Sequence, residues 1–176
     1  MSLLSGCLVA DPPTYEEPPP TPPVFDLANA NPFIGGVIVV DRRGTNPTRV
    51  VNVSVPFRSS DNGDSVIAAL HLDWSFEGEG FTEGLAEIAP STFDDTERTI
   101  DLTWRLDHRP PTAGCHTLTL LAAHESNWET ETFRPHIIRG RNDTAMATWW
   151  VNVDPPEGEP YTLRNCPSRR DPQVPE

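Results

Sequence analysis

Hydrophobic and polar residues alternate with a period of two along most of the chain after Phe33. In the clearest run every second residue is apolar: Val66, Ala68, Leu70, Leu72, Trp74 and Phe76. Because successive side chains of a strand point to opposite faces, this pattern predicts half-buried β-strands. We expect seven of them, at residues 35–41, 49–57, 66–76, 85–89, 99–106, 116–124 and 145–153.

The segments between these strands are rich in the turn residues Gly, Pro, Asn and Asp. Short strands separated by such turns are typical of an antiparallel β-sandwich. We therefore expect one folded domain over residues 33–154, followed by a C-terminal tail at 155–176. Trp74, on the third strand, is predicted to fill the space between the two sheets.

Two stretches of these strands resemble immunoglobulin-like domains of the PKD type. Residues 72–80 read Leu-Asp-Trp-Ser-Phe-Glu-Gly-Glu-Gly, which is similar to the Trp-Asp-Phe-Gly-Asp-Gly run of that family. Residues 113–120 are similar to its Gly-x-Tyr-x-Val-x-Leu strand, with His116 in place of the tyrosine. The resemblance covers two of the seven strands. It implies an all-β, immunoglobulin-like antiparallel β-sandwich with disordered or extended N- and C-terminal tails.

The N-terminal sequence Leu4-Ser5-Gly6-Cys7 resembles the lipobox of bacterial lipoproteins. In that family a peptidase cuts before the cysteine, so the resemblance implies that residues 1–7 are a signal-peptide remnant and that Cys7 is lipidated. Residues 8–32 are rich in proline and predict an extended tether. A secretory signal also needs a positive start and an apolar stretch. Since neither precedes Cys7, the expectation requires a true start upstream; the alternative is an ordinary tail with a free thiol.

The net charge of −13 and the pI near 4.6 change the list of possible partners. Binding to nucleic acid requires a basic face, so this class of partner is excluded. Charge alone would also not hold the protein on anionic lipid, which leaves that task to a lipid anchor. Apolar runs such as residues 37–40 are too short to cross a bilayer.

The chain has three cysteines, an odd number for an exported protein. If Cys7 carries lipid, Cys115 and Cys166 remain and can pair in an oxidising compartment. The position of Cys115 has the opposite parity to the core residues Leu118 and Leu120, so its thiol should face outward, toward the returning tail. We therefore predict a Cys115–Cys166 disulfide. In a cytosolic protein, two free thiols would be the default.

Motifs that carry catalysis are missing from the sequence: it has no Gly-x-Ser-x-Gly, His-Glu-x-x-His, P-loop or Gly-x-Gly-x-x-Gly. The five histidines are scattered and are expected to be structural or exposed. No cofactor is expected, with calcium as the one possible metal. Three connections that meet at one end of an immunoglobulin-like sandwich supply Asp61, Asn62, Asp64, Asp94, Asp95 and Asp143. The candidate calcium ligands among them are Asp61, Asp64, Asp94 and Asp95. The alternative is that these carboxylates lie in plain turns and keep the domain soluble.

The connection at residues 125–143 is long for this fold and combines aromatic residues with arginine: Trp128, Phe133, Arg134, Arg139 and Arg141. These residue types are enriched at binding surfaces, and loops usually carry the function of a sandwich. The connection is therefore predicted to contact a partner. The alternative is that its apolar residues form an extra hairpin packed on the sheet.

Together these features predict a non-enzymatic lipoprotein of the bacterial cell envelope, periplasmic or surface-exposed. Its immunoglobulin-like domain would bind an envelope protein or a glycan. A second hypothesis is a structural subunit of a larger surface or envelope assembly, joined through exposed strand edges. A third is a hydrolase that uses acidic residues.

Overall fold

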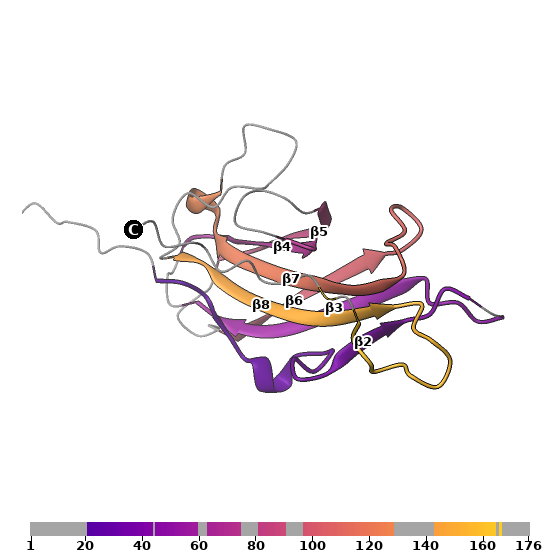
Figure 1. Ribbon diagram of the computed structural model, residues 1–176. Coiled ribbons are helices and arrows are strands. Elements are labelled where there is room, and N and C mark those ends of the chain that lie inside the picture. Colours follow the sequence, from indigo (N-terminus) through magenta and orange to yellow (C-terminus); the bar gives the residue numbers. More distant parts are fainter. Residues whose placement is uncertain are drawn as a thin grey trace, which may run out of the picture.

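Two β-sheets pack face to face in the computed structural model of the chain (Figure 1). The structure describes residues 21–43, 45–59, 63–74, 81–90, 97–128 and 143–164, together with Cys166. The strands are β1 (Val24–Phe25), β2 (Val37–Val40), β3 (Val50–Arg58), β4 (Val66–Leu72), β5 (Phe81–Ile88), β6 (Glu97–Arg105), β7 (Gly114–His124) and β8 (Ala145–Val153). The short 3-10 helices η1 (Leu27–Asn29) and η2 (Glu125–Asn127) follow β1 and β7. Among the described residues, no helix is long and apolar enough to cross a membrane.

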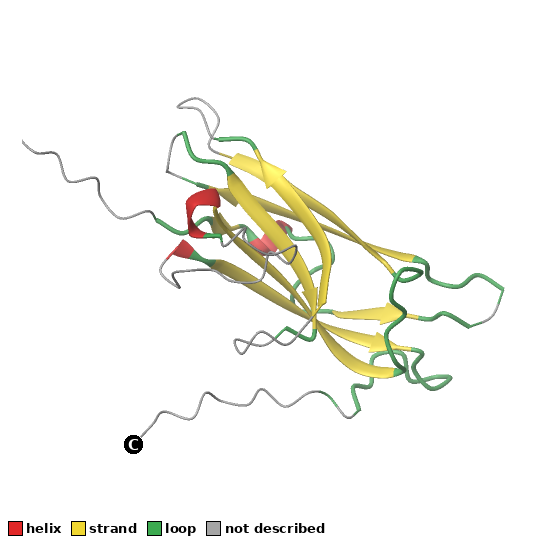
Figure 2. Cartoon of the chain, turned by 90° about the horizontal axis from the view of Figure 1, so that it is seen from above, coloured by secondary structure: helices red, strands yellow, loops and turns green. Residues whose placement is uncertain are grey.

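The connections between strands pass repeatedly from one sheet to the other. The three-stranded sheet has the order β1-β3-β6, and the five-stranded sheet has the order β2-β8-β7-β4-β5. All neighbours are antiparallel except β2, which runs parallel to β8. Seen from above, the strands run along the molecule and their connections gather at two ends (Figure 2). The predicted all-β fold is confirmed, and this arrangement is that of an immunoglobulin-like sandwich.

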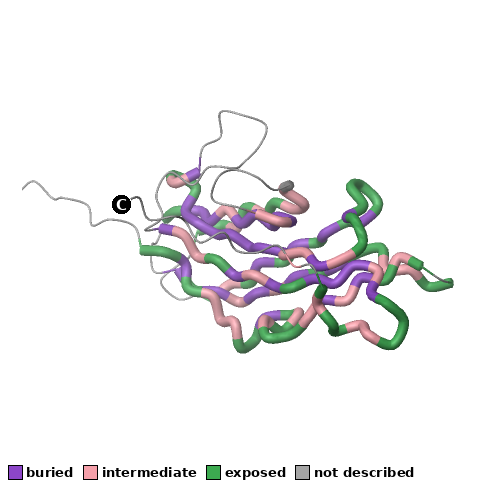
Figure 3. The backbone as a smooth tube through the Cα atoms, viewed as in Figure 1, coloured by how far each residue is buried: buried purple, intermediate pink, exposed green. Residues whose placement is uncertain are grey.

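The core lies between the sheets, where the inward residues of the alternating strands meet (Figure 3). On β3 the inward residues Val53, Val55 and Phe57 are at most 1% exposed. The largest core side chains are Trp104 of β6 and Trp149 of β8, and both are fully buried. Burying one side chain the size of Phe57 stabilises the fold by about 1.5–3 kcal/mol, so this layer is the main source of stability.

The predicted role of Trp74 in this core is wrong. Strand β4 ends at Leu72, and Asp73 has a left-handed φ of 51°, which takes Trp74 out of the alternating pattern. Trp74 instead packs on the outer face of the five-stranded sheet, in a small second cluster made of Ile67, Ala69, Leu121, Ala123 and Trp128. Trp104 and Trp149 fill the space between the sheets in its place.

The folded domain begins earlier than the predicted boundary at residue 33. Strand β1 pairs with the end of β3, and Asn31 exchanges two backbone hydrogen bonds with Ser54, of 2.7 and 2.8 Å. The indole N–H of Trp149 donates to the carbonyl of Pro32 (2.8 Å). Part of the predicted tether is therefore packed on the sandwich. The many prolines of this stretch predicted an extended tether, and the strand β1 within it is too short, at two residues, to show an alternating pattern.

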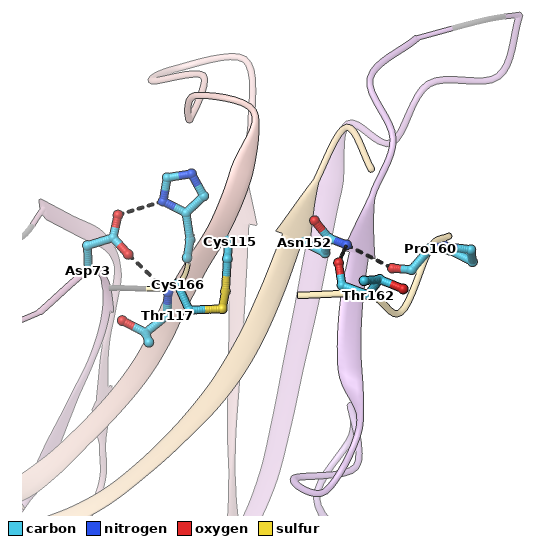
Figure 4. Close-up of a disulfide and its surroundings, with 8 residues drawn as sticks. Asp73, Cys115, Thr117, Asn152, Pro160, Thr162 and Cys166 are labelled. Atoms are coloured by element: carbon cyan, nitrogen blue, oxygen red, sulfur yellow. Dashed lines mark hydrogen bonds and ion pairs between the residues drawn. A yellow bond between two sulfur atoms is a disulfide. The ribbon is translucent and has the colours of Figure 1, made fainter. Parts of the chain in front are cut away.

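The C-terminal tail returns over the outer face of the five-stranded sheet, as predicted (Figure 4). A disulfide joins Cys115 to Cys166, with their Cα atoms 4.6 Å apart. Beside it, on β8, the Asn152 side-chain amide donates to the carbonyls of Pro160 and Thr162 (3.1 and 3.0 Å). Cys115 and Asn152 are partners in the β7–β8 ladder, so the covalent and polar contacts hold the tail at one site.

Removing this disulfide should destabilise the domain. The bridge spans 51 residues, and constraining a loop of that length in the unfolded chain is worth about 4 kcal/mol in the chain-entropy model. We expect the Cys115→Ala/Cys166→Ala variant to lose about 2–4 kcal/mol in urea denaturation. Tyr161→Ala, an exposed substitution in the same tail, is the control and should change little. Equal stability of oxidised and reduced protein would contradict this expectation.

Candidate functional site

Three connections meet at one end of the sandwich and surround an open depression of about 610 Å³. We call this region the loop end. Its walls come from the β3–β4 connection, from β5 and the residue pair after it, and from the segment that follows β7: Gly63, Asp64, Ser65, Glu87, Pro90, Glu125, Ser126 and Trp128. Three of these side chains are carboxylates and none is basic, so the described lining is acidic. The predicted convergence of the three connections is therefore correct.

Hydrogen bonds between two of the connections fix one wall of the depression. The Ser65 hydroxyl donates to Glu125 Oε2 (2.5 Å), and the backbone N–H of Glu125 donates to the Ser65 carbonyl (2.9 Å). Glu125 is also the first residue of η2. The wall is thus positioned by backbone pairing, while Asp64 and Ser126 remain exposed to solvent.

Below the loop end a buried hydrogen-bond chain links Ser59, His124 and Asp143. Ser59 Oγ lies 2.9 Å from His124 Nε2, and Asp143 Oδ1 lies 2.6 Å from His124 Nδ1. The second oxygen of Asp143 accepts the backbone N–H of His124 (3.2 Å). Such an order activates the serine in hydrolases when its hydroxyl faces substrate. Here Ser59 is only 2% exposed, so the chain fastens the ends of β3 and β7 to the residues before β8.

Sequence reasoning missed this cluster because nothing local signals it. In the sequence His124 is one of five scattered histidines, and Ser59 is 65 residues away from it. Ser59 and Asp143 come together only because the register of β7 places its last residue, His124, between the β3–β4 connection and the residues before β8. A buried histidine at a strand end, followed by an acidic residue before the next strand, is the weak signal that was available.

One of the four predicted calcium ligands lies in the depression. Asp64 is part of its wall, whereas Asp61, Asp94 and Asp95 lie outside the described residues. Within the described part of the chain, no group of three His, Cys, Asp or Glu side chains is placed to hold a metal ion. Calcium binding therefore stays a prediction.

The predicted contact role of Trp128 needs correction. Its side chain is 3% exposed, and its indole N–H donates to the carbonyl of Ala123 (3.2 Å). The ring packs on the outer face of β7 and β4, beside Leu121 and Ala69. Trp128 is therefore a packing residue of this face, while the hairpin alternative falls on residues outside the described ones. The other predicted contact residues, Phe133, Arg134, Arg139 and Arg141, lie outside the described residues.

The opposite end of the sandwich is held by a second set of polar contacts. Asp73 accepts the backbone N–H of Thr117 (2.9 Å) and lies 2.6 Å from His116 Nδ1 (Figure 4). Arg42 binds Asp154 through its backbone N–H and its guanidinium, and also reaches the carbonyl of Pro111. Burial alone would raise the pKa of the Asp154 carboxyl, but these bonds from Arg42 lower it. This end is therefore held by ion pairs and the disulfide.

A half-buried carboxyl group lies at the side where β5 approaches β6. The β4–β5 register shifts between Leu70 and His71, which leaves Glu83 without a partner on β4, as in a β-bulge. Burial raises the pKa of Glu83, against the opposing charge of Arg109. At the next residue, a Cβ on Gly84 would lie 3.4 Å from Leu102 Cδ2, so the two strands are in close contact. Glu83 lies near the start of β5, beside the end of β4, and is not among the residues that line the depression at the loop end.

No known family profile matches this sequence, and no curated protein matches it.

The Asp73–His116 contact should make stability depend on pH. The hydrogen bond to Asp73 raises the pKa of the His116 imidazole, against the opposing effect of burial. A raised pKa in the folded state means that His116 stabilises the fold when protonated. This contribution is complete below the unfolded pKa of about 6.5 and is lost as pH rises through the folded value.

We expect the free energy of unfolding of the wild type to fall, relative to that of His116→Gln, between pH 6 and pH 8.5. Urea denaturation at half-unit pH intervals measures the difference. His108→Gln, in the exposed loop after β6, is the control and should leave the slope unchanged. A wild-type and a His116→Gln profile that run parallel would refute the assignment.

Proposed function

We propose that this protein is a non-enzymatic, lipid-anchored module of the bacterial cell envelope that binds a protein or glycan partner through its loop end. The observation that carries the proposal is the Cys115–Cys166 bridge. Disulfides persist in oxidising compartments and are rare in the cytosol, so this bridge supports export. It also accounts for two of the three cysteines and leaves Cys7 as the one thiol for lipid.

The loop end is the part of the domain best suited to binding. Its walls come from three connections that a rigid sandwich holds in place, and binding sites concentrate on such loops. Asp64, Glu87 and Glu125 give it negative charge and many hydrogen-bond acceptors. Both properties suit a partner that presents lysine, arginine or sugar hydroxyl groups.

Binding is favoured over catalysis by the way the described polar side chains are used. The Ser59–His124–Asp143 chain is buried, and His116 is hydrogen-bonded to Asp73 at the closed end. These contacts join segments of the fold, and none of them forms a wall of the depression. They support a domain whose polar groups stabilise the frame that presents the loops.

The alternative, a structural subunit of a larger assembly, has one observation in its favour. Strands β2 and β5 form the two edges of the five-stranded sheet. An edge strand has unpaired backbone groups that can extend a neighbouring sheet. Polymers larger than a dimer in native mass spectrometry of the purified protein would favour this alternative over a discrete binding module.

The anchor can be tested directly. In the native host, protein made with its natural upstream sequence should enter the membrane fraction and incorporate radiolabelled palmitate. Mass spectrometry should find an acylated peptide that begins at Cys7. Cys7→Ser should abolish both signals, whereas Cys166→Ser should keep them. A soluble wild type with an intact Met1 would refute the lipoprotein proposal.

The binding surface can be tested by photo-cross-linking in living cells. A benzoylphenylalanine at Ser126, which is exposed on the loop end, should cross-link to a partner of defined mass. The matched control carries the same group at Thr99, exposed on the outer face of the three-stranded sheet. We expect at least a several-fold stronger adduct from Ser126. Equal adducts from the two positions, or adducts from Thr99 alone, would place the contact elsewhere.

A further inference from the structure

Strand β5 is the least buried of the long strands. It lies at the edge of the five-stranded sheet and forms backbone pairs with β4 alone. Among the strands longer than two residues, it is the one in which no described side chain is fully buried. Ala86 and Ile88 are only partly buried against the core, and Gly84 has no side chain to add. Few apolar contacts therefore hold β5 on the three-stranded sheet, so a single unfavourable group there matters.

Glu83 places a carboxyl group in this contact. The β4–β5 register shifts between Leu70 and His71, which leaves Glu83 in the bulge. Its Oε1 atom is buried, as is Nε1 of Trp104 on β6, and among the described residues neither atom makes a hydrogen bond of normal geometry. The indole N–H lies near enough to lower the pKa of the carboxyl, but the effect of burial is larger. An acceptor and a donor are thus buried near each other without the full compensation that such groups need.

The other titratable groups near Glu83 come from the elements packed against it. Burial raises the pKa of the Glu83 carboxyl, and Arg109 and His108, in the connection after β6, lower it by less. On β4 the titratable neighbour is His71, whose Nδ1 lies 3.4 Å from the hydroxyl of the residue before Glu83. Strand β6 presents Trp104, which does not titrate. The balance of these groups disfavours the charged form of Glu83.

We infer that Glu83 is a pH-sensitive switch, which fastens β5 to the three-stranded sheet while its carboxyl is protonated and loosens β5 when the carboxyl ionises. A buried carboxylate costs more free energy than a buried carboxylic acid, and opening of β5 returns the charge to water. A carboxyl whose pKa is raised by folding stabilises the packed state fully below the unfolded pKa of about 4.3. This stabilisation is lost as the pH rises through the folded pKa.

Strand β5 connects this switch to the loop end. Glu83 lies near the start of the strand, whereas Glu87, near its end, is one of the residues that line the acidic depression. Loosening of β5 therefore leaves the Glu87 wall of the depression less firmly positioned, while the Glu125 wall keeps its bonds to Ser65. This consequence for binding rests on the proposed function, but the switch itself does not.

Hydrogen exchange of the full chain, measured by mass spectrometry without any partner, tests the switch. The protection factors of β5, relative to those of β7, should fall roughly tenfold between pH 5 and pH 8, as expected for a folded pKa raised by about one unit. Glu83→Gln, which stays neutral, should keep β5 at its pH 5 protection throughout. Glu87→Gln removes an exposed carboxyl from the same strand. It is the matched control and should retain the wild-type fall.

Carbon-13 NMR of the glutamate carboxyl groups measures the ionisation itself and covers the case in which Glu83→Gln fails to fold. The Glu83 signal should titrate with a midpoint clearly above the ordinary value of about 4.3. A midpoint at or below that value would overturn the inference. So would β5 protection that is constant or rises with pH, as an ion pair with Arg109 would produce. A fall that survives in Glu83→Gln would assign the effect to another group, such as His71. Since neither measurement involves a partner, failure of the proposed function would leave both results unchanged.

Discussion

Strand β7 is buried on both of its faces. Its outer face needs a cover that the second sheet cannot give, and segments outside the strands provide it. Leu118, Leu120 and Ala122 point into the core, but Leu121 and Ala123 on the opposite face are also at most 1% exposed. A sandwich of two sheets covers only the inner set. The outer set is covered by aromatic side chains from the segments that follow β4 and β7, while the C-terminal tail covers the beginning of β7.

The two ends of the sandwich are stabilised by different chemistry. At the loop end the buried Ser59–His124–Asp143 chain joins connections that are far apart in sequence, and an acidic depression stays open above it. The opposite end combines a disulfide with the Arg42–Asp154 and Asp73–His116 contacts. A disulfide and ion pairs therefore hold the segments of one end together. At the loop end the stabilising hydrogen bonds are buried, so most of the residues that line the depression stay exposed to solvent. This division is what makes the loop end the better candidate for binding.

The alternating pattern predicted the strands well because water faces one side of most of them. It failed at Trp74, where the left-handed backbone of Asp73 shifts the alternation, and at β1, whose two residues are too few to show a period. The disulfide was predictable because the parity of Cys115 and the cysteine count are properties of the sequence. Of the site, the meeting of the three connections followed from the fold class. The buried role of Trp128 and the Ser59–His124–Asp143 chain did not, since both depend on tertiary register.

The pairing of Val24 with Arg58 places the entry of the chain into the domain at the loop end, beside the β3–β4 connection. A linker attached there pulls on the same end that bears the acidic depression. If Cys7 is the point of attachment, the depression would face the anchoring surface and not the surrounding solution. A proline-rich linker of sixteen residues, the number from 8 to 23, would span at most roughly 50 Å at the polyproline II rise of about 3.1 Å per residue. A partner would then have to be thin enough to enter that gap or be part of the same surface.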